Sequence, residues 1–257
     1  MRLSPRPLRA SSLAVLGLLA LATPLFAAES LLVKNALLIT MKPGEGDPFI
    51  GYMSVGADGR IAAIAPGEPP ATLKADRILD AGGKFVAPGF VSSHSHLADS
   101  PLRGIGHNQE LNDWGRTRQQ FLQYTTADDI YWFVFHGALD YLRSGITTAY
   151  DFEAGGTVQL RVPSGQVTPP PIIKAGPFSE AQIRGKADAG LRFVPSIALP
   201  AVGTDDEIVE RFDKVYRWAK EKYADNPLFI KMGISGQLGR APSKQTAFLE
   251  ARIMKAY

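Results

Sequence analysis

The stretch KFVAPGFVSSHSH, residues 84–96, marks a change in the pattern of the chain. It is an extended apolar run that is interrupted by Pro88-Gly89 and ends in His94-Ser95-His96. Because side chains alternate along a β-strand, His94 and His96 should project to the same side and converge on one ion. Taken alone, two histidines on one strand face can equally be surface or interface residues. The stretch predicts a strand that ends in a candidate metal-binding pair.

Downstream of this stretch, predicted strands and helices alternate. Capping boxes at Thr126 and Thr204 open two of the helices. Four strands are expected, at Phe90–His94, Ile146–Asp151, Leu191–Ile197 and Leu228–Ile234. This alternation indicates an α/β fold with parallel strands and right-handed crossovers. Four such strands could form an open doubly wound sheet or half of an eight-stranded barrel, and no glycine-rich phosphate loop favours a dinucleotide-binding sheet.

Upstream of residue 84, short strand-like segments alternate with turn formers such as Asp58-Gly59 and Pro66-Gly67. The segments are residues 31–41, 50–55, 60–64 and 77–80. Turn formers separate the segments, and they do not read as βαβ units. We therefore expect a small antiparallel β module in this part of the chain.

Residues 1–28 have the pattern of a signal peptide. Arg2, Arg6 and Arg9 precede a short apolar run, Leu13–Leu21, and small residues follow at Ala27-Ala28. A stable bilayer-spanning helix needs about 20 apolar residues, so the run is too short for one. We expect cleavage, a periplasmic or secreted protein, and no membrane span after cleavage. An uncleaved anchor is the alternative.

The composition excludes several classes of function. The chain has 28 Lys and Arg against 25 Asp and Glu, but residues 1–28 contain three Arg and no acidic residue. The rest of the chain is therefore electrically balanced, which argues against nucleic-acid binding. The chain has no cysteine, so any metal must be held by histidine and carboxylate groups.

The run from Asp80 to His96 resembles the opening of the amidohydrolase superfamily barrel, where a small β-sandwich precedes a strand with the same Pro-Gly-Phe-x-x-x-His-x-His arrangement. Leu102-Arg103-Gly104, followed by Leu111 and Trp114, looks like the branch of cytosine deaminases, chlorohydrolases and methylthioadenosine deaminases. Residues 145–151 are similar to the second barrel strand of that branch. The resemblance implies a partial TIM (β/α)8 barrel of about four strands at residues 84–257, after part of a β-sandwich at residues 29–83.

The resemblance also implies a chemistry. The family hydrolyses non-peptide C–N bonds, in cyclic amides, amidines or aminated heterocycles, with a hydroxide on a divalent metal. Zinc is the expected ion, His94 and His96 are its expected ligands, and the substrate is a small molecule. In the family, further ligands and the catalytic base follow later barrel strands, beyond residue 257. Residues 250–257 read as the middle of a helix, so we expect an incomplete chain that is inactive alone.

The sequence allows more than one role for several other residues, and more than one function for the chain. Arg103 and His107, in the loop after the first barrel strand, either contact substrate or make local hydrogen bonds. Lys231 would be carboxylated and bridge two metals in a dipeptide or N-acyl-amino-acid hydrolase, but an outward-pointing lysine is the preferred interpretation. Asp151 is expected to anchor the loop that follows its strand and not to act as a base, and His136 is expected to be structural or exposed. A non-catalytic binding protein that keeps the histidine pair is a further alternative.

Overall fold

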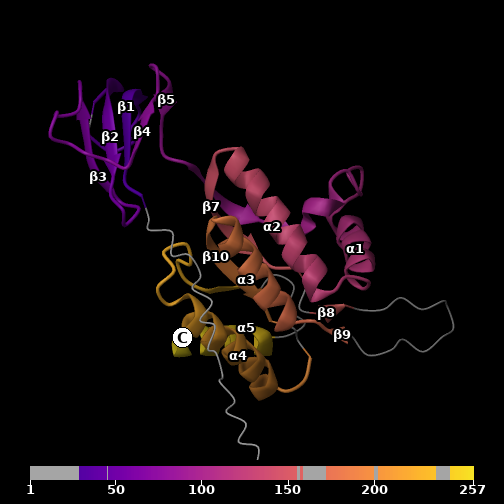
Figure 1. The fold of residues 1–257 in the computed structure, drawn as a ribbon. Coiled ribbons are helices and arrows are strands. Elements are labelled where there is room, and N and C mark those ends of the chain that lie inside the picture. The colour runs from indigo at the N-terminus through magenta and orange to yellow at the C-terminus, as the bar shows by residue number, and fades with distance from the viewer. Residues whose placement is uncertain (1–28, 45, 155–156, 159–171, 200–201, 236–243) are drawn as a thin grey trace, which may run out of the picture. The chain divides into compact units, whose positions relative to one another are not determined.

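The computed structural model describes residues 29–44, 46–154, 157–158, 172–199, 202–235 and 244–257 (Figure 1). The chain divides into two compact units, Met1–Pro88 and Gly89–Tyr257. The predicted signal peptide, residues 1–28, lies outside the described residues and stays a prediction. Within the described part of the chain, no helix combines the length and apolar character that crossing a bilayer requires.

The first unit is built on one five-stranded sheet. Its strands are β1 (Leu31–Leu38), β2 (Phe49–Val55), β3 (Ile61–Pro66), β4 (Arg77–Asp80) and β5 (Phe85–Val86). The sheet order is β3-β2-β1-β4, and β5 also pairs with β1. Val33, Ala36 and Leu38 of β1 form its buried core with Ala81.

The prediction of an antiparallel module is right for β1, β2 and β3 and wrong for β4, which pairs with β1 in parallel. Strand β5, which lies beyond the predicted module, also pairs with β1 in parallel. The connection between β3 and β4 explains the difference. It runs from residue 67 to residue 76, long enough to carry the chain across the sheet, whereas a tight hairpin would have returned it antiparallel.

The second unit contains a parallel sheet of four strands. They are β6 (Phe90–Ser95), β7 (Ile146–Phe152), β10 (Arg192–Ala198) and β11 (Gly233–Ser235). Their order in the sheet is their order in the chain, and every pairing is parallel. The predicted α/β fold with a parallel sheet is confirmed. A doubly wound sheet would reverse its strand order at a switch point, and these four strands do not.

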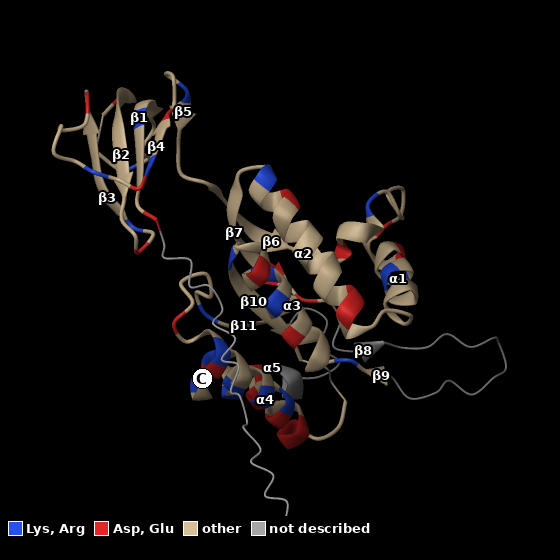
Figure 2. Ribbon diagram, viewed as in Figure 1, with Lys and Arg blue, Asp and Glu red and all other residues tan. Residues whose placement is uncertain are grey.

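Helices α2 (Ala127–Arg143), α3 (Pro177–Ala189), α4 (Asp205–Tyr223) and α5 (Lys244–Ala256) pack against this sheet (Figure 1). Both predicted capping boxes form, at Thr126 with Asp129 and at Thr204 with Glu207. Gly190 ends α3 in the left-handed conformation, with φ of 83°, which glycine adopts without a steric cost. Charges of both signs lie along α4, acidic in its first turn and basic in its last, as the helix dipole favours (Figure 2).

Several elements differ from the sequence-based expectation. The 3-10 helix η1 (Leu97–Leu102) and the helix α1 (Leu111–Leu122) were not predicted. The sequence of α1 gives little indication of a helix, because it is polar and contains Gly115. Strand β11 is shorter than predicted, since Phe229 reaches Phe193 of β10 only through an isolated bridge. A small antiparallel pair, β8 (Thr157–Val158) with β9 (Ile172–Ile173), flanks a segment outside the described residues.

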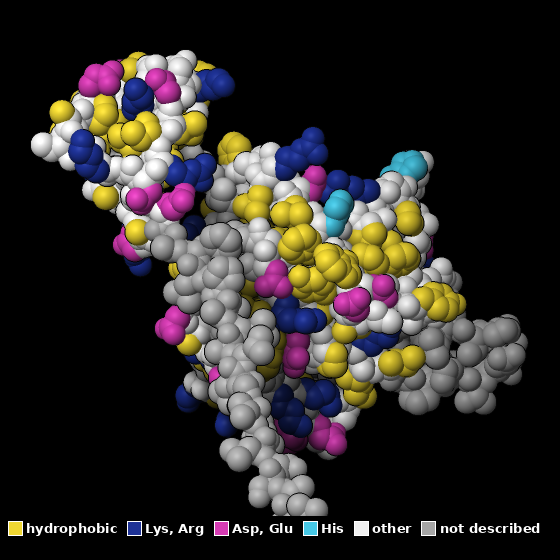
Figure 3. All heavy atoms as spheres, viewed as in Figure 1, with side chains coloured by type: hydrophobic (Ala, Val, Ile, Leu, Met, Phe, Trp, Pro, Cys, Tyr) yellow, Lys and Arg dark blue, Asp and Glu magenta, His cyan; other side chains and the backbone are white. Residues whose placement is uncertain are grey.

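Apolar side chains also remain on the surface of the second unit. Trp132 and Leu139 of α2 are 55% and 44% exposed, and Figure 3 shows apolar side chains gathered over the α2 region. Apolar atoms contribute a large part of the surface of folded proteins.

Candidate metal centre

The histidine pair lies at the carboxyl end of β6. The Nε2 atoms of His94 and His96 are 3.2 Å apart, and the two ring planes are inclined at 75°. His94 is exposed and His96 is half-buried. The buried Ser95 between them bonds to the hydroxyl of Ser92. The prediction that alternation brings both imidazoles to one side of the strand is confirmed.

Phe152, the last residue of β7, orients both rings. The His96 Nδ1 lies 3.1 Å from the Phe152 carbonyl oxygen, and the His94 ring lies on the Phe152 ring with centroids 4.2 Å apart. Because a carbonyl oxygen can only accept, the His96 Nδ1–H donates and the His96 Nε2 carries the lone pair. The His94 Nε2–H then donates to the His96 Nε2.

This geometry fits a shared divalent cation. With Zn–N bonds of about 2.0–2.1 Å and tetrahedral angles, two ligand nitrogens lie about 3.3 Å apart, close to the separation of the His94 and His96 Nε2 atoms. Burial lowers the pKa of His96, and the Arg118 guanidinium lowers it further against the opposing effect of Asp99. The ring is therefore held in the neutral form that metals bind.

The pair supplies only part of a ligand set. No group of three or more His, Cys, Asp or Glu side chains that could hold a metal occurs among the residues that the structure describes. Catalytic zinc sites use three protein ligands and a water. His94 and His96 can therefore begin a zinc site, and further ligands are needed to complete it.

A network of buried charges lies behind the strand ends. Asp151 of β7 is fully buried and accepts two hydrogen bonds, at 2.9 Å from the Leu97 backbone N–H and at 2.7 Å from the Lys186 Nζ. Asp151 thus acts as an anchor, but for the segment that follows β6 and not for the loop after its own strand, which was the expectation. Glu153 is buried nearby, and its carboxyl oxygens make no hydrogen bond of normal geometry to the described residues.

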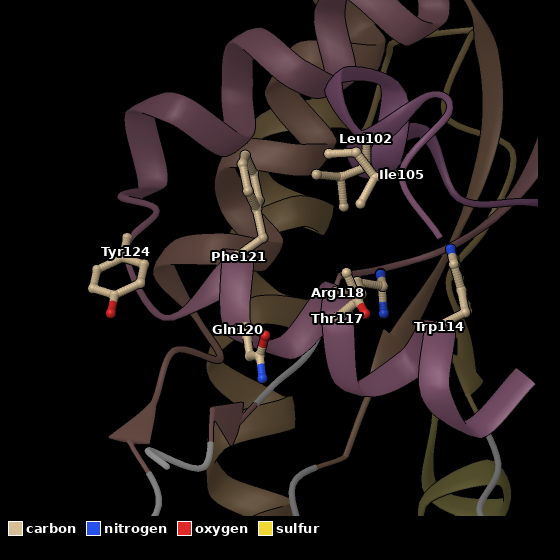
Figure 4. Close-up of a pocket in the computed structure, with 8 residues that line it drawn as sticks. All are labelled: Leu102, Ile105, Trp114, Thr117, Arg118, Gln120, Phe121 and Tyr124. Carbon is tan, nitrogen blue, oxygen red and sulfur yellow. The ribbon is translucent and has the colours of Figure 1, made fainter. Parts of the chain in front are cut away.

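A pocket of about 290 Å³ lies between α1 and the stretch that holds Leu102 and Ile105. Trp114 lines it and is a ring neighbour of His96, with centroids 6.3 Å apart. Figure 4 shows the α1 side chains facing Leu102 and Ile105 across the pocket. The lining residues are Leu102, Ile105, Trp114, Thr117, Arg118, Gln120, Phe121 and Tyr124.

Arg118 gives this apolar pocket a polar group. Its Nε donates to Asp99 Oδ1 at 2.7 Å, and its guanidinium lies 5.8 Å from the centre of the Trp114 ring. Both partners of the ion pair are largely buried. Neither Asp99 nor Arg118 was predicted to matter, because the pair joins η1 to a helix that the sequence pattern did not indicate. The only signal for this site in the sequence was Trp114, which belongs to the residues that carry the family resemblance.

The structure places the other predicted residues elsewhere. Arg103 forms an ion pair with Asp140 of α2 at 2.6 Å, and the His107 Nδ1–H donates to the Gly104 carbonyl at 2.9 Å. These are the local hydrogen bonds of the alternative interpretation, and a substrate contact by either residue stays a prediction. Lys231 is exposed just before β11, in agreement with the outward-pointing interpretation. The exposed His136 lies 3.4 Å from the Ser100 hydroxyl.

Comparison with known proteins finds a matching family profile and several similar deaminases. A profile described as "Amidohydrolase family" matches residues 85–244, more than half of the chain. The chain is 28% identical over 195 residues to a 5-methylthioadenosine/S-adenosylhomocysteine deaminase of Symbiobacterium thermophilum, which covers 74% of the chain and 39% of the relative. It is 36% identical over 123 residues to a 5'-deoxyadenosine deaminase of Methanosarcina barkeri, and the match covers 47% of the chain and 27% of the relative.

Solved structures share the fold. The atrazine chlorohydrolase TrzN from Arthrobacter aurescens TC1, complexed with zinc, aligns with a TM-score of 0.65 and 17% identity over 88% of this chain and 51% of that one. A guanine deaminase from C. acetobutylicum with bound guanine aligns with a TM-score of 0.63 and 16% identity, covering 89% and 51%. The chain thus spans about half the length of these structures and less than half of the sequence relatives.

Proposed function

Because the chain belongs to the amidohydrolase family, we propose that it provides the first half of a hydrolase that cleaves non-peptide C–N bonds at a divalent metal. The observation that carries the proposal is the 3.2 Å separation of the His94 and His96 Nε2 atoms at the carboxyl end of a parallel strand. Active sites of (β/α)8 enzymes gather at this end of the strands. Zinc is the proposed ion.

We propose that β6, β7, β10 and β11 are the first four strands of a (β/α)8 barrel. Their sequential order and the helices packed on them support this. The sheet of the first unit is proposed as one layer of a small β-sandwich. In this arrangement the remaining barrel strands would carry the further metal ligands and the catalytic base.

Residues of this chain would have distinct roles at such a site. His94 and His96 would hold the ion, and Phe152 orients both rings through the contacts described above. When bound, a divalent cation supplies activation of water as a nucleophile near neutral pH. The pocket between α1 and Ile105 is proposed to receive the flat apolar part of a small heterocyclic substrate, with Trp114 and Arg118 on its wall.

The substrate class follows from the relatives and the pocket together. The relatives named above are deaminases of purine derivatives, and the solved structures include an atrazine chlorohydrolase. An aminated heterocycle, cyclic amide or amidine is therefore the proposed substrate class. The relatives named above give no comparable support to a dipeptide hydrolase with a bridging Lys231. Export to the periplasm or the exterior is proposed from residues 1–28 alone, and N-terminal sequencing of the mature protein tests it.

Zinc titration by calorimetry tests the metal site. We expect the chain to bind one zinc ion, and His94→Ala and His96→Ala each to abolish binding because one imidazole alone cannot hold the ion. His136→Ala, on the exposed side of α2, is the matched control and should bind zinc as the parent does.

Zinc binding that survives both His94→Ala and His96→Ala would refute the site. No zinc binding by the parent would refute a zinc site built on His94 and His96 in this chain. We further expect residues 29–257 alone to show no deaminase or dechlorinase activity, because the described residues do not complete a ligand set.

A further inference from the structure

We propose that the buried ion pair of Asp151 and Lys186 is a positioning device for the His96 ligand. The pair holds the backbone immediately after His96, while the neighbouring Phe152 carbonyl holds the His96 ring. Two consecutive residues at the end of β7 would thus fix one metal ligand at two points. This inference rests on the metal site proposed above and adds to it residues that touch no metal.

The hold acts just beyond the β-ladder. The register between β6 and β7 shifts between Ser92 and Ser95, and the last ladder pair is Ser95 with Asp151, so His96 and Leu97 follow the paired part of β6. After Ser95 the chain turns into η1, and the His96 side chain does not cap that helix. The first N–H groups of a helix have no partner inside it. The Asp151 carboxylate satisfies the N–H of Leu97, the first residue of η1.

Lys186 compensates the charge of the buried Asp151 carboxylate. Asp151 and Lys186 are both fully buried, and the Lys186 Nζ also lies 5.6 Å from the centre of the Phe193 ring. A buried carboxylate without a partner carries a large desolvation cost. The ion pair with Lys186 offsets that cost, and the paired Asp151 carboxylate accepts a charge-assisted hydrogen bond from the Leu97 N–H.

The position of Lys186 is itself set by close packing of two helices. A Cβ on Gly185, its neighbour in α3, would lie 2.8 Å from the Tyr131 carbonyl oxygen of α2. The backbone of α3 thus approaches α2 closely beside Lys186. A buried ion pair adds little net stability compared with apolar residues of the same volume, so its main effect here is geometric.

Two single variants test the proposal in the whole chain: Asp151→Asn and Lys186→Met. In the zinc-free parent, ¹⁵N NMR should show His96 as the Nδ1–H tautomer. In each variant we expect mixed His96 tautomers and zinc affinity weakened by about 10–100-fold, the usual effect of removing a group that orients a metal ligand. The double variant removes both charges and leaves an amide oxygen for the Leu97 N–H, so it should recover much of the parent behaviour.

Val215→Ala is the control for general loss of stability. Val215 is buried in the α4 core, in a cluster separate from the one that contains Leu97. The control should lower the free energy of unfolding and leave both the His96 tautomer and zinc affinity unchanged. If Val215→Ala alters them as much as Lys186→Met does, the proposal is wrong. It is equally wrong if the single variants fold and keep the parent tautomer and affinity.

Hydrogen exchange of the parent decides the matter even if the variants fail to fold. The Leu97 amide should exchange slowly, as a hydrogen bond to a buried carboxylate requires, and exchange as fast as in an exposed turn would overturn the proposal. The tautomer and exchange measurements need no metal. A parent that binds no zinc therefore refutes the metal site while leaving the positioning role to be judged on these two results.

Discussion

Glu153, at the end of β7, should make the stability of the second unit depend on pH. Its side chain is buried, and burial raises the pKa of its carboxyl from 4.5 to about 8. Lys186 and Ser179 oppose this effect and Asp151 adds to it. Replacing Glu153 by glutamine keeps the shape of the protonated side chain and removes its ionisation.

The sign and size of the effect follow from proton linkage. Between pH 4.5 and about 8, folded Glu153 keeps a proton that the unfolded chain has released, so stability falls as the pH rises through this window. The loss grows by about 1.36 kcal/mol for each pH unit, which amounts to on the order of 5 kcal/mol at pH 8. Glu153→Gln should therefore match the parent near pH 4.5 and exceed its stability increasingly up to pH 8.

Urea unfolding followed by tryptophan fluorescence measures this difference, because Trp114, Trp132 and Trp218 all lie in the second unit. The free energy of unfolding of parent and variant should be compared at several pH values from 4.5 to 8.5. Glu221→Gln, at an exposed position of α4, is the control and should show no such trend. A difference between parent and Glu153→Gln that is constant with pH would refute the reasoning.

Two further changes test the packing and the helix caps. Gly185→Ala places a methyl group 2.8 Å from the Tyr131 carbonyl oxygen, so it should destabilise the second unit by about 1–3 kcal/mol in urea unfolding. Gly115→Ala, in α1 with nothing within 4 Å, is the matched substitution and should be neutral or stabilising by up to about 1 kcal/mol; equal losses at both sites would contradict the packing argument. Thr126→Ala removes the acceptor for the Asp129 N–H and should cost about 1 kcal/mol, and an unchanged urea midpoint would show that the capping box contributes nothing.

Features that depend on neighbours in the sequence were predictable. The parallel strands of the second unit, both capping boxes and the glycine at the end of α3 follow from local periodicity and residue type. Helix α1 was missed for the same reason, since its sequence has few apolar positions and a central glycine. The parallel pairing of β4 with β1 also escaped prediction, because a ten-residue connection permits more than one path across the sheet.

The sequence by itself determined that His94 and His96 share one side of a strand, because the two-residue repeat of a strand is a property of the local backbone. Only the tertiary structure decided what surrounds them. The Phe152 carbonyl that orients His96 is 56 residues away, and Lys186 is 35 residues from Asp151. Such partners meet because strands and helices pack in a particular register, and no local spacing in the sequence specifies that register.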